Sequence, residues 1–375
     1  MNEIEKPLEK IKKKARRIKP KTLNWLIAIF AAVIIVQNVS PSILSFLGDI
    51  ELFNVSATVN TITNVISRYP GFFESVILRI ATIAILIVLI MLKVCASIKE
   101  TVIIIRHSTF SNFMLSYDRE CFDNVEIIEK EINLVDEMDR NDIDGAIQIQ
   151  DEVIKSILNN CNRKNQLFYY GIAHSPLIFR AGFQIGSAVY VRLLHHDHSR
   201  GSSFKELPED DDVKKRLKVN CNIVPGNSEE MLVVIETSRK IKDDDLEVFT
   251  KKKPCCILRF SPDEGSTYSF DDFASYGIMK RLREQILREI ATQIDRDEVK
   301  ISRINLVLST SSAFTFFLGQ GFSQNYFPEV VVYHYDYNTV EKYPWGLYCK
   351  APTSSALVRN SIPAEAMPEA LGASK

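Results

Sequence analysis

The strongest hydrophobic signal lies near the amino terminus, where two apolar runs occupy residues 25–36 and 80–92. A helix that crosses the hydrocarbon core of a bilayer needs about 20 residues, so flanking residues have to complete each span. Trp25 suits a membrane interface, and Arg79 and Lys93 bracket the second run, from where their charges can reach opposite headgroup regions. The pattern predicts two transmembrane helices within residues 23–98, joined by a short external loop.

Two other interpretations of these runs stay open. A basic segment before a short apolar stretch is also typical of a signal peptide, although no A-x-A-like cleavage site follows the first run. Two buried core helices would account for the runs as well, but the second run is apolar on every face rather than amphipathic. Because basic residues precede the first run and follow the second, the positive-inside rule predicts an inner-membrane protein with both termini in the cytoplasm.

Helical spacing of apolar residues continues after the second run. It is carried by Ile127, Ile128, Ile132, Val135 and Met138, in a stretch with few Gly or Pro. Residues 99–160 are therefore predicted to form a helical linker. The Ala-, Ser-, Pro- and Glu-rich residues 351–375 are expected to be a disordered tail.

Between these segments the pattern changes to short β-rich runs separated by helix signals, which predicts an α/β domain over residues 161–350. The expected strands are residues 167–172, 188–194, 231–236, 256–260, 304–308 and 330–335. Residues 276–294 carry Ile or Leu at intervals of four, which predicts an amphipathic helix.

Charge narrows the possible ligands. Residues 1–22 form a basic cytoplasmic segment with nine Lys or Arg and three Glu, hence +6, so the rest of the chain carries −7 within a total of −1. A net acidic remainder argues against duplex nucleic acid, whose binding needs many contacts from Lys and Arg to phosphates. The seven cysteines contain no C-x-x-C pair, as expected for reduced thiols facing a cytosol.

The α/β region contains an internal repeat. Residues 167–182, LFYYGIAHSPLIFRAG, match residues 304–319, INLVLSTSSAFTFFLG, at an offset of 137. Each copy reads as a strand, a small polar turn, an apolar helix and a glycine, Gly182 in one copy and Gly319 in the other. AVYVRLLHHD then matches PEVVVYHYD, which pairs His195 with His334. Two β-α-β units are therefore predicted, with chance similarity of a common unit as the alternative.

The turns of the two units supply candidate ligand-binding residues, because ligands of open α/β sheets bind at the carboxyl ends of the strands. Helix N-termini there favour anions, and a third turn after the strand at 231–236 adds two cations. Pseudo-twofold packing would join the turns into one pocket for a cyclic ligand with repeated phosphates. The alternatives are hydroxyls that only cap their own helices and a merely solvated basic loop. The predicted site residues are His174, Ser175, Thr237, Ser238, Arg239, Lys240, Ser309, Thr310, Ser311 and Ser312.

A family resemblance rests on three segments, LVLSTSSAFTFFLGQGF at 306–322, VVVYHYDYN at 330–338 and VVIETSRKI at 233–241. They resemble the SAVED domain, which is similar to two fused CARF-type, Rossmann-like subdomains. The resemblance implies a sensor of a cyclic oligonucleotide made by a cognate nucleotidyltransferase in bacterial CBASS anti-phage signalling. With two spans, it further implies an effector that oligomerises when ligand binds and disrupts the inner membrane, causing abortive infection. The second copy ends soon after Tyr348, so its remaining strands are expected to come from earlier segments.

Other chemistry is weakly supported by the sequence. Residues 195–198, HHDH, contain possible metal ligands, but neighbours on a strand point to opposite faces, so a polar strand end is expected instead of a metal site. No G-x-S-x-G elbow, Walker loop or H-E-x-x-H motif occurs. We therefore expect a protein without catalytic residues or cofactor. A membrane-anchored enzyme that degrades its ligand or uses a metal, and a passive membrane-anchored scaffold, are the alternatives.

Overall fold

The computed structural model describes two compact units, Met1–Glu100 and Thr101–Lys375. The description covers residues 24, 26–27, 76–97, 100–113, 115–122, 125–160, 166–196, 203–209, 215–223, 228–263, 266–296, 300–322 and 326–360. The basic segment 1–22, most of the first predicted span and the predicted external loop lie outside these residues.

The first unit contains the helix α6 (Val76–Ser97), which coincides with the second predicted span. Several of its aliphatic side chains are exposed, namely Ile80, Ile83, Ile85, Ile87, Val88, Ile90 and Met91. Within the described residues, no helix meets the length and apolarity required for crossing a membrane. The helix is confirmed, and the two-span topology stays a prediction.

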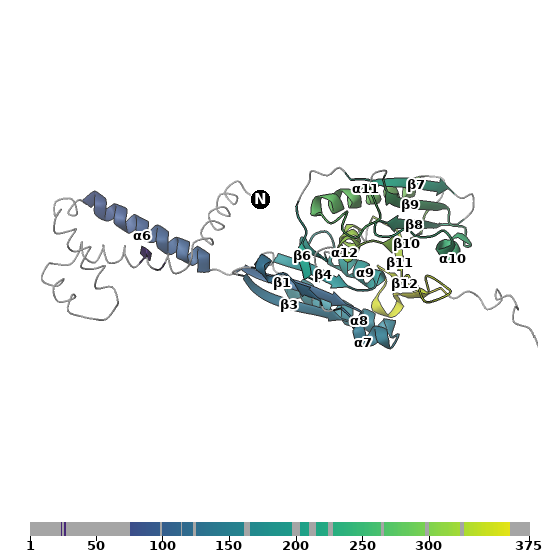
Figure 1. Cartoon of the computed structure of the whole chain (residues 1–375), viewed down its shortest axis with the longest axis horizontal. Coiled ribbons are helices and arrows are strands. Elements are labelled where there is room, and N and C mark those ends of the chain that lie inside the picture. Colours follow the sequence, from purple (N-terminus) through teal and green to yellow (C-terminus); the bar gives the residue numbers. More distant parts are fainter. Residues whose placement is uncertain are drawn as a thin grey trace, which may run out of the picture. The chain divides into compact units, whose positions relative to one another are not determined.

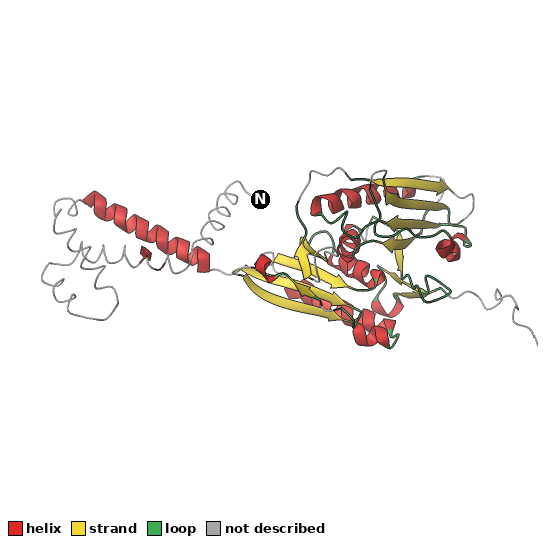
Figure 2. Ribbon diagram, viewed as in Figure 1, coloured by secondary structure: helices red, strands yellow, loops and turns green. Residues whose placement is uncertain are grey.

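The second unit contains two sheets (Figures 1 and 2). The first has the order β2-β6-β5-β4-β1-β3. Its strands are β1 (Glu100–Ser108), β2 (Ser116–Tyr117), β3 (Val125–Asn133), β4 (Gln166–Ile172), β5 (Val191–His196) and β6 (Ser203–Glu206). Its helices are η1 (Arg119–Phe122), α7 (Val135–Asp139), α8 (Ile143–Asn160) and α9 (Ser175–Ile185). β4 is parallel to β1 and β5, and β6 is antiparallel to β5. We call this part lobe 1.

The second sheet has the order β13-β12-β11-β10-β8-β9-β7 and forms lobe 2. Its strands are β7 (Leu217–Ile223), β8 (Glu230–Glu236), β9 (Cys256–Pro262), β10 (Arg303–Ser309), β11 (Glu329–Tyr333), β12 (Trp345–Tyr348) and β13 (Leu357–Arg359). Its helices are η2 (Asp244–Leu246), α10 (Glu247–Thr250), α11 (Tyr276–Ile294), α12 (Ser312–Gly321) and η3 (Thr353–Ser355). β10 is parallel to β8 and β11, and β12 is antiparallel to β11.

One continuous hydrophobic core joins the two lobes. It contains side chains from α8, α9, α11 and α12 together with one face of each sheet, and Figure 1 shows α9 and α12 between the sheets. Alternation along each strand explains this: Ile103 and Ile105 of β1 point into the shared core, and Val102 and Ile104 into a separate cluster on the outer face. The period of two in the sequence thus separates an inner from an outer face.

The two lobes repeat the same topology, since β6-β5-β4-β1-β3 corresponds to β12-β11-β10-β8-β9. α9 and α12 cross where a Cβ on Gly182 would lie 2.1 Å from the Phe316 oxygen, and one on Gly319 would lie 2.2 Å from the Phe179 oxygen. Phe179 and Phe316 are themselves equivalent at the offset of 137, so the crossing is pseudo-twofold. The predicted repeat is confirmed, and lobe 2 takes its remaining strands β7, β8 and β9 from earlier segments, as expected.

Two predictions of secondary structure were wrong. Residues 99–160 are not a wholly helical linker, because β1 and β3 are strands of the first sheet and only α7, α8 and η1 are helical. The β-branched run at 102–105 outweighs the helical spacing that follows it, since it is buried between two other strands. Residues 351–360 are ordered rather than disordered, because β13 pairs with β12 and the Asn360 side chain donates to the Tyr343 carbonyl at 3.0 Å. Residues 361–375 lie outside the described part.

Candidate ligand-binding site

The candidate site lies where the carboxyl ends of the parallel strands of both lobes meet. In lobe 1 β1 leads into Thr109 and β4 into His174, and in lobe 2 β8 leads into Thr237. Strand register makes Thr109 and Thr237 equivalent, because Ser108 pairs with Ile172 of β4 as Glu236 pairs with Ser309 of β10. The Thr109 N–H donates to the Ile172 carbonyl at 3.3 Å, and the Thr237 N–H to the Ser309 carbonyl at 2.9 Å. The turn Thr237–Lys240 thus has a counterpart at residues 109–112, which was not predicted from the sequence.

The first contact between the lobes at this edge is aromatic. His334 follows β11, and the centroid of its ring lies 4.5 Å from that of His174. The His334 ring centroid also lies 4.8 Å from that of Trp345 in β12. On its other side His174 stacks on Phe110, with ring centroids 4.6 Å apart. His174 Nδ1 is 2.8 Å from Thr109 Oγ1. The turn after β4 therefore touches both the end of β1 and the end of β11.

A second contact between the lobes involves the residue equivalent to His334. His195, the partner of His334 in the repeat, lies at the end of β5 with its Nε2 2.9 Å from Asp271 Oδ1. Asp271 belongs to the loop after β9, and in that loop the Ser269 N–H donates to the Thr237 carbonyl at 3.0 Å. The end of β5 therefore contacts a loop of lobe 2 that is bonded to the end of β8, so the two lobes meet a second time at this edge.

The hydroxyl-rich turn of lobe 2, residues 309–312, and its counterpart in lobe 1 show which hydroxyls only cap their own helices. Ser311 is the N-cap of α12, because its Oγ accepts from the Phe314 N–H at 3.3 Å. Ser175 and Ser312 are the first residues of their helices and are not the N-caps, which are His174 and Ser311. Thr310 Oγ1 lies 2.6 Å from Thr315 Oγ1, which also satisfies it locally. Capping therefore accounts for Ser311, and Ser175 and Ser312 are left half-buried beside the helix starts.

The basic turn is joined to the hydroxyl turn. The Arg239 N–H donates to Ser309 Oγ at 3.1 Å, and the Ser238 N–H to the Ser309 carbonyl at 2.9 Å. The Arg239 and Lys240 side chains are exposed, with the Arg239 guanidinium 5.7 Å from the centre of the Phe270 ring. The Ser238 hydroxyl is buried and has no hydrogen-bond partner among the described residues. Two exposed cations and an unused hydroxyl thus lie at one edge of lobe 2.

Glu236 holds the basic turn in place. This nearly inaccessible carboxylate accepts from the Ile241 N–H at 2.7 Å and from Arg259 Nε and the Tyr268 hydroxyl at 3.1 Å each. The turn is therefore fixed at its start by Ser309 and at its end by Glu236. Burial, with the nearby Glu236 charge, raises the pKa of Tyr268 to about 12, so that hydroxyl remains a donor.

Three histidines of the site are kept neutral. Burial lowers the pKa of His107 and of His174 to about 3 and that of His334 to about 4. Repulsion from His174 adds to the effect on the pKa of His107, and repulsion from His334 adds to that on His174. His107, at the end of β1, lies 3.1 Å from the Tyr169 hydroxyl through Nδ1, and its Nε2 has no partner among the described residues. These imidazoles therefore act as neutral hydrogen-bonding and stacking groups rather than as cations.

A pH prediction follows from these three residues. An unfolded chain with ordinary imidazoles binds more protons than the fold between pH 6.5 and about 4, so the free energy of unfolding should fall as pH drops through that window. His174→Gln should reduce the slope by at most about 1.4 kcal/mol per pH unit. Urea denaturation across the window measures it. An unchanged slope in the variant would show that His174 is not held neutral.

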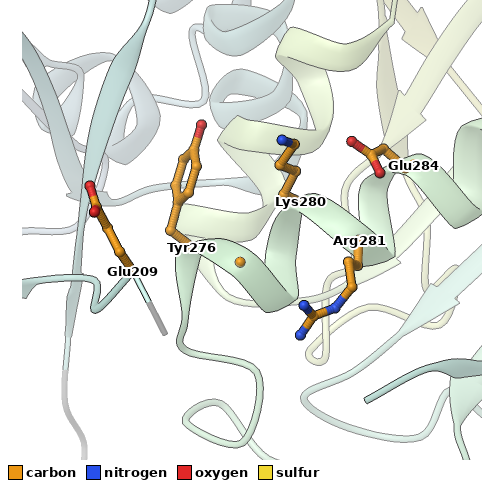
Figure 3. A pocket seen from close by; sticks show the side chains of 6 residues that line it. Glu209, Tyr276, Lys280, Arg281 and Glu284 are labelled. Carbon is orange, nitrogen blue, oxygen red and sulfur yellow. The ribbon is translucent and has the colours of Figure 1, made fainter. Parts of the chain in front are cut away.

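A cavity among the described residues lies away from these turns. It has a volume of about 510 Å³ and is lined by Glu209, Tyr276, Gly277, Lys280, Arg281 and Glu284, five of which lie on the first turns of α11 (Figure 3). None of the predicted site residues lines it. Its two carboxylates and two cations balance each other, so it offers no net charge to a phosphate ligand.

A metal site has little support in the described part of the chain. His195 and His196 end β5, as the predicted polar strand end requires, and Asp197 and His198 lie outside the described residues. No group of three His, Cys, Asp or Glu side chains among the described residues is placed to hold an ion. The absence of a cofactor stays a prediction.

The fold and site define a class of protein, a pseudo-symmetric α/β module of two fused Rossmann-like lobes with a polar edge between them. The family model "SMODS-associated and fused to various effectors sensor domain" matches residues 149–348, more than half of the chain. The chain therefore belongs to the SAVED family, as the sequence resemblance indicated. The predicted α/β, two-subdomain fold is confirmed with it.

Solved structures with a related fold include SAVED/CARF-domain receptors named Cap4. The Acinetobacter baumannii receptor with the cyclic trinucleotide 2'3'3'-cAAA has 15% identity and a TM-score of 0.45, and the match covers 80% of this chain and 63% of that one. The same receptor with 3'3'3'-cAAA has 15% identity and a TM-score of 0.44, and the match covers 80% of this chain and 64% of that one. The Moraxella osloensis receptor has 14% identity and a TM-score of 0.40, and the match covers 78% of this chain and 60% of that one. This chain thus spans less than two thirds of each receptor. No curated protein matches the chain.

Proposed function

We propose that the unit 101–375 senses a cyclic oligonucleotide at the candidate site and that binding activates the N-terminal segment at a membrane. The observation that carries the proposal is the pair of contacts that join the lobes at this edge, His174 with His334 and the end of β5 with the loop after β9, through His195 and Asp271. A ring-shaped ligand with repeated phosphodiesters has the symmetry of such an edge.

The chemistry of the edge supports a small anionic ligand. The N-termini of α9 and α12 present backbone N–H groups there, which favour phosphate oxygens. Arg239 and Lys240 add exposed cations, and the half-buried Ser175 and Ser312 add hydroxyls. Beyond residue 22 the chain is net acidic, so the positive charge is local, which suits a small nucleotide better than a duplex.

The test is calorimetric titration of the full chain in detergent with 3'3'-cyclic di-AMP, 3'3'-cyclic di-GMP, 2'3'3'-cAAA, 3'3'3'-cAAA and a cyclic tetra-adenylate. Saturable binding of at least one cyclic oligonucleotide is expected. If none of them binds, the sensing proposal is wrong and the scaffold alternative gains support. Ligand turnover during the titration would instead favour the enzyme alternative.

Substitutions in the basic turn should weaken that binding. Arg239→Ala and Lys240→Ala each remove a cation able to bind phosphate, and a hydrogen bond between charged groups corresponds to a change of about tenfold or more in affinity. Ser312→Ala should have a smaller effect in the same direction. Lys280→Ala, at the separate cavity on α11, is the matched control and should leave affinity unchanged. Equal affinity of the wild type and the Arg239 and Ser312 variants would remove this site assignment.

The membrane part of the proposal rests on the two apolar runs and on the exposed aliphatic side chains of α6. We further propose that the ligand binds a homo-oligomer more tightly than the monomer. Ligand binding then favours the oligomer, because a ligand shifts an equilibrium only through its differential affinity for the two states. Clustered N-terminal segments then bring Arg79 and Lys93 together at bilayer depth, where charged groups admit water. The protein would accordingly act as an inner-membrane effector without enzymatic activity of its own.

Reconstitution separates the two halves of the proposal. Full-length protein in vesicles of anionic lipid should release an entrapped dye only when the bound cyclic oligonucleotide is added, and light scattering should report a larger assembly in detergent. Binding without dye release or assembly would retain the sensor and reject the membrane-disrupting effector.

A further inference from the structure

The two turns that follow β1 and β8 are equivalent in structure and different in chemistry. By the strand register, Thr237-Ser238-Arg239-Lys240 of lobe 2 corresponds to Thr109-Phe110-Ser111-Asn112 of lobe 1. The cations of lobe 2 thus have a serine and an asparagine as counterparts, and the small Ser238 has Phe110 as its counterpart. The pseudo-twofold symmetry of the backbone does not extend to the side chains.

Lobe 1 instead presents a row of rings that continues into lobe 2. Phe113 meets Phe110 edge to face at 6.1 Å, Phe110 stacks on His174 at 4.6 Å, and His174 meets His334 at 4.5 Å. Trp345 closes the row behind His334. The position equivalent to His174 in lobe 2 is Ser311, a buried cap, so the row has no symmetric partner there.

The accessible end of this row is aromatic and apolar. Phe110 is 38% exposed and Phe113 is 52% exposed, although both lie beside strand ends whose other residues are polar. No cation lies on the turn 109–112, and Arg106 of β1 is paired with Glu131 at 3.8 Å. Such a surface has little to offer a phosphate, but it suits the π-face of a nucleobase, which stacks on aromatic side chains with limited dependence on sequence.

From this placement, and resting on the proposed sensing function, we infer that Phe110 and Phe113 form a subsite on which one base of the cyclic oligonucleotide stacks, with the ligand's phosphates turned toward Arg239 and Lys240. The ligand is then held in one orientation, although the backbone of its site is pseudo-symmetric. Purines, with the larger stacking area, fit this subsite better than pyrimidines.

The experiment uses the full chain with Trp25→Phe, which leaves Trp345 as the only tryptophan. Fluorescence of Trp345, at the closed end of the ring row, reports titration with the tightest-binding oligonucleotide of the panel named above and with the same molecule carrying one abasic residue. Phe110→Ala and Phe113→Ala should each weaken binding of the complete ligand by about tenfold, from the usual contribution of one base–aromatic stack. Phe110→Tyr, which retains the ring, should stay within about twofold of the parent.

A double-mutant cycle makes the assignment specific. Removal of the stacked base should weaken binding to the parent protein but have little further effect on Phe110→Ala, because the two changes remove the same interaction. Tyr326→Ala is the matched control, since Tyr326 is 55% exposed but precedes β11, at the opposite edge of the sheet. Undiminished binding by both alanine variants, or additive effects for every abasic position, would overturn the inference and leave the sensing proposal intact. Failure of the parent to bind any oligonucleotide would overturn both.

Discussion

Replacing Gly319 by alanine is expected to destabilise the unit 101–375 by about 3 kcal/mol, the upper end of what overpacking usually costs. The new Cβ would lie 2.2 Å from the Phe179 carbonyl oxygen and 3.1 Å from the Phe183 nitrogen. Both are backbone atoms of α9, so no side chain can rotate away, and the two helices would have to separate. Since α9 and α12 join the lobes in one core, the strand ends that form the site would separate with them. Denaturant unfolding measures the loss.

Gly321 of the same helix supplies the control. A Cβ there meets Arg283 Cδ and Leu287 Cδ1 at 2.8 Å each, and these are the ends of flexible side chains. Gly321→Ala should therefore change the free energy of unfolding by less than about 1 kcal/mol. Gly182→Ala should reproduce the Gly319 result, because its Cβ would lie 2.1 Å from the Phe316 oxygen. A Gly319→Ala protein as stable as Gly321→Ala would contradict the close pseudo-twofold crossing.

Replacing Arg180 by methionine is expected to cost about 3–5 kcal/mol, the usual effect of breaking a buried ion pair from one side. The Arg180 side chain, 3% exposed, pairs with Asp151 of α8 at 2.7 Å. It also donates to the backbone carbonyls of Tyr348 at 2.7 Å and Ala351 at 3.1 Å. The methionine would leave the Asp151 carboxylate without its counter-charge and these carbonyls without the guanidinium donor. Unfolding experiments should show the loss, and hydrogen exchange should show it first in residues 345–360.

Arg140→Met is the matched comparison. Arg140 pairs with Glu137 at 3.1 Å, but its side chain is 67% exposed, so its loss should change stability by less than about 1 kcal/mol.

The double variant Arg180→Met with Asp151→Leu should recover part of the stability lost in Arg180→Met, because no unpaired carboxylate remains. Similar small effects for Arg180→Met and Arg140→Met would show that the buried pair does not hold the segment after β12.

The repeat was readable from the sequence because each copy combines a strand, a turn, an apolar helix and a glycine at a fixed offset. The helix at 276–294 and the six expected strands are present with boundaries shifted by a few residues. β1 and β3 were missed because the apolar residues at 127–138 recur at helical spacing, which favoured a helix for the whole stretch 99–160. Only strand pairing distinguishes that pattern from a helix, and pairing between residues distant in sequence leaves no local mark.

The site was only partly predicted, again because β1 was not recognised as a strand. The turns of the repeat gave His174, Ser309 and their neighbours, and the strand at 231–236 gave Thr237–Lys240. Phe110 and Thr109 follow the unrecognised strand β1, so nothing placed them beside His174. The run at 102–105 followed by RHST was the available signal. His334 was paired with His195 in the repeat, but its contact with His174 depends on how the lobes pack, which no sequence pattern records.

β1 also limits how a displacement caused by ligand binding at the candidate site could be transmitted through the sheet. Its last residue adjoins Thr109, while its first, Glu100, follows α6 after two residues. One strand of nine residues, about 30 Å long, therefore lies between the candidate site and the end of α6 along the chain. Val102 to Ser108 pair with β4 throughout, and a strand bonded in this way does not stretch. A displacement at Thr109 would therefore move β1 together with β4, as a rigid body and not by extension of one strand.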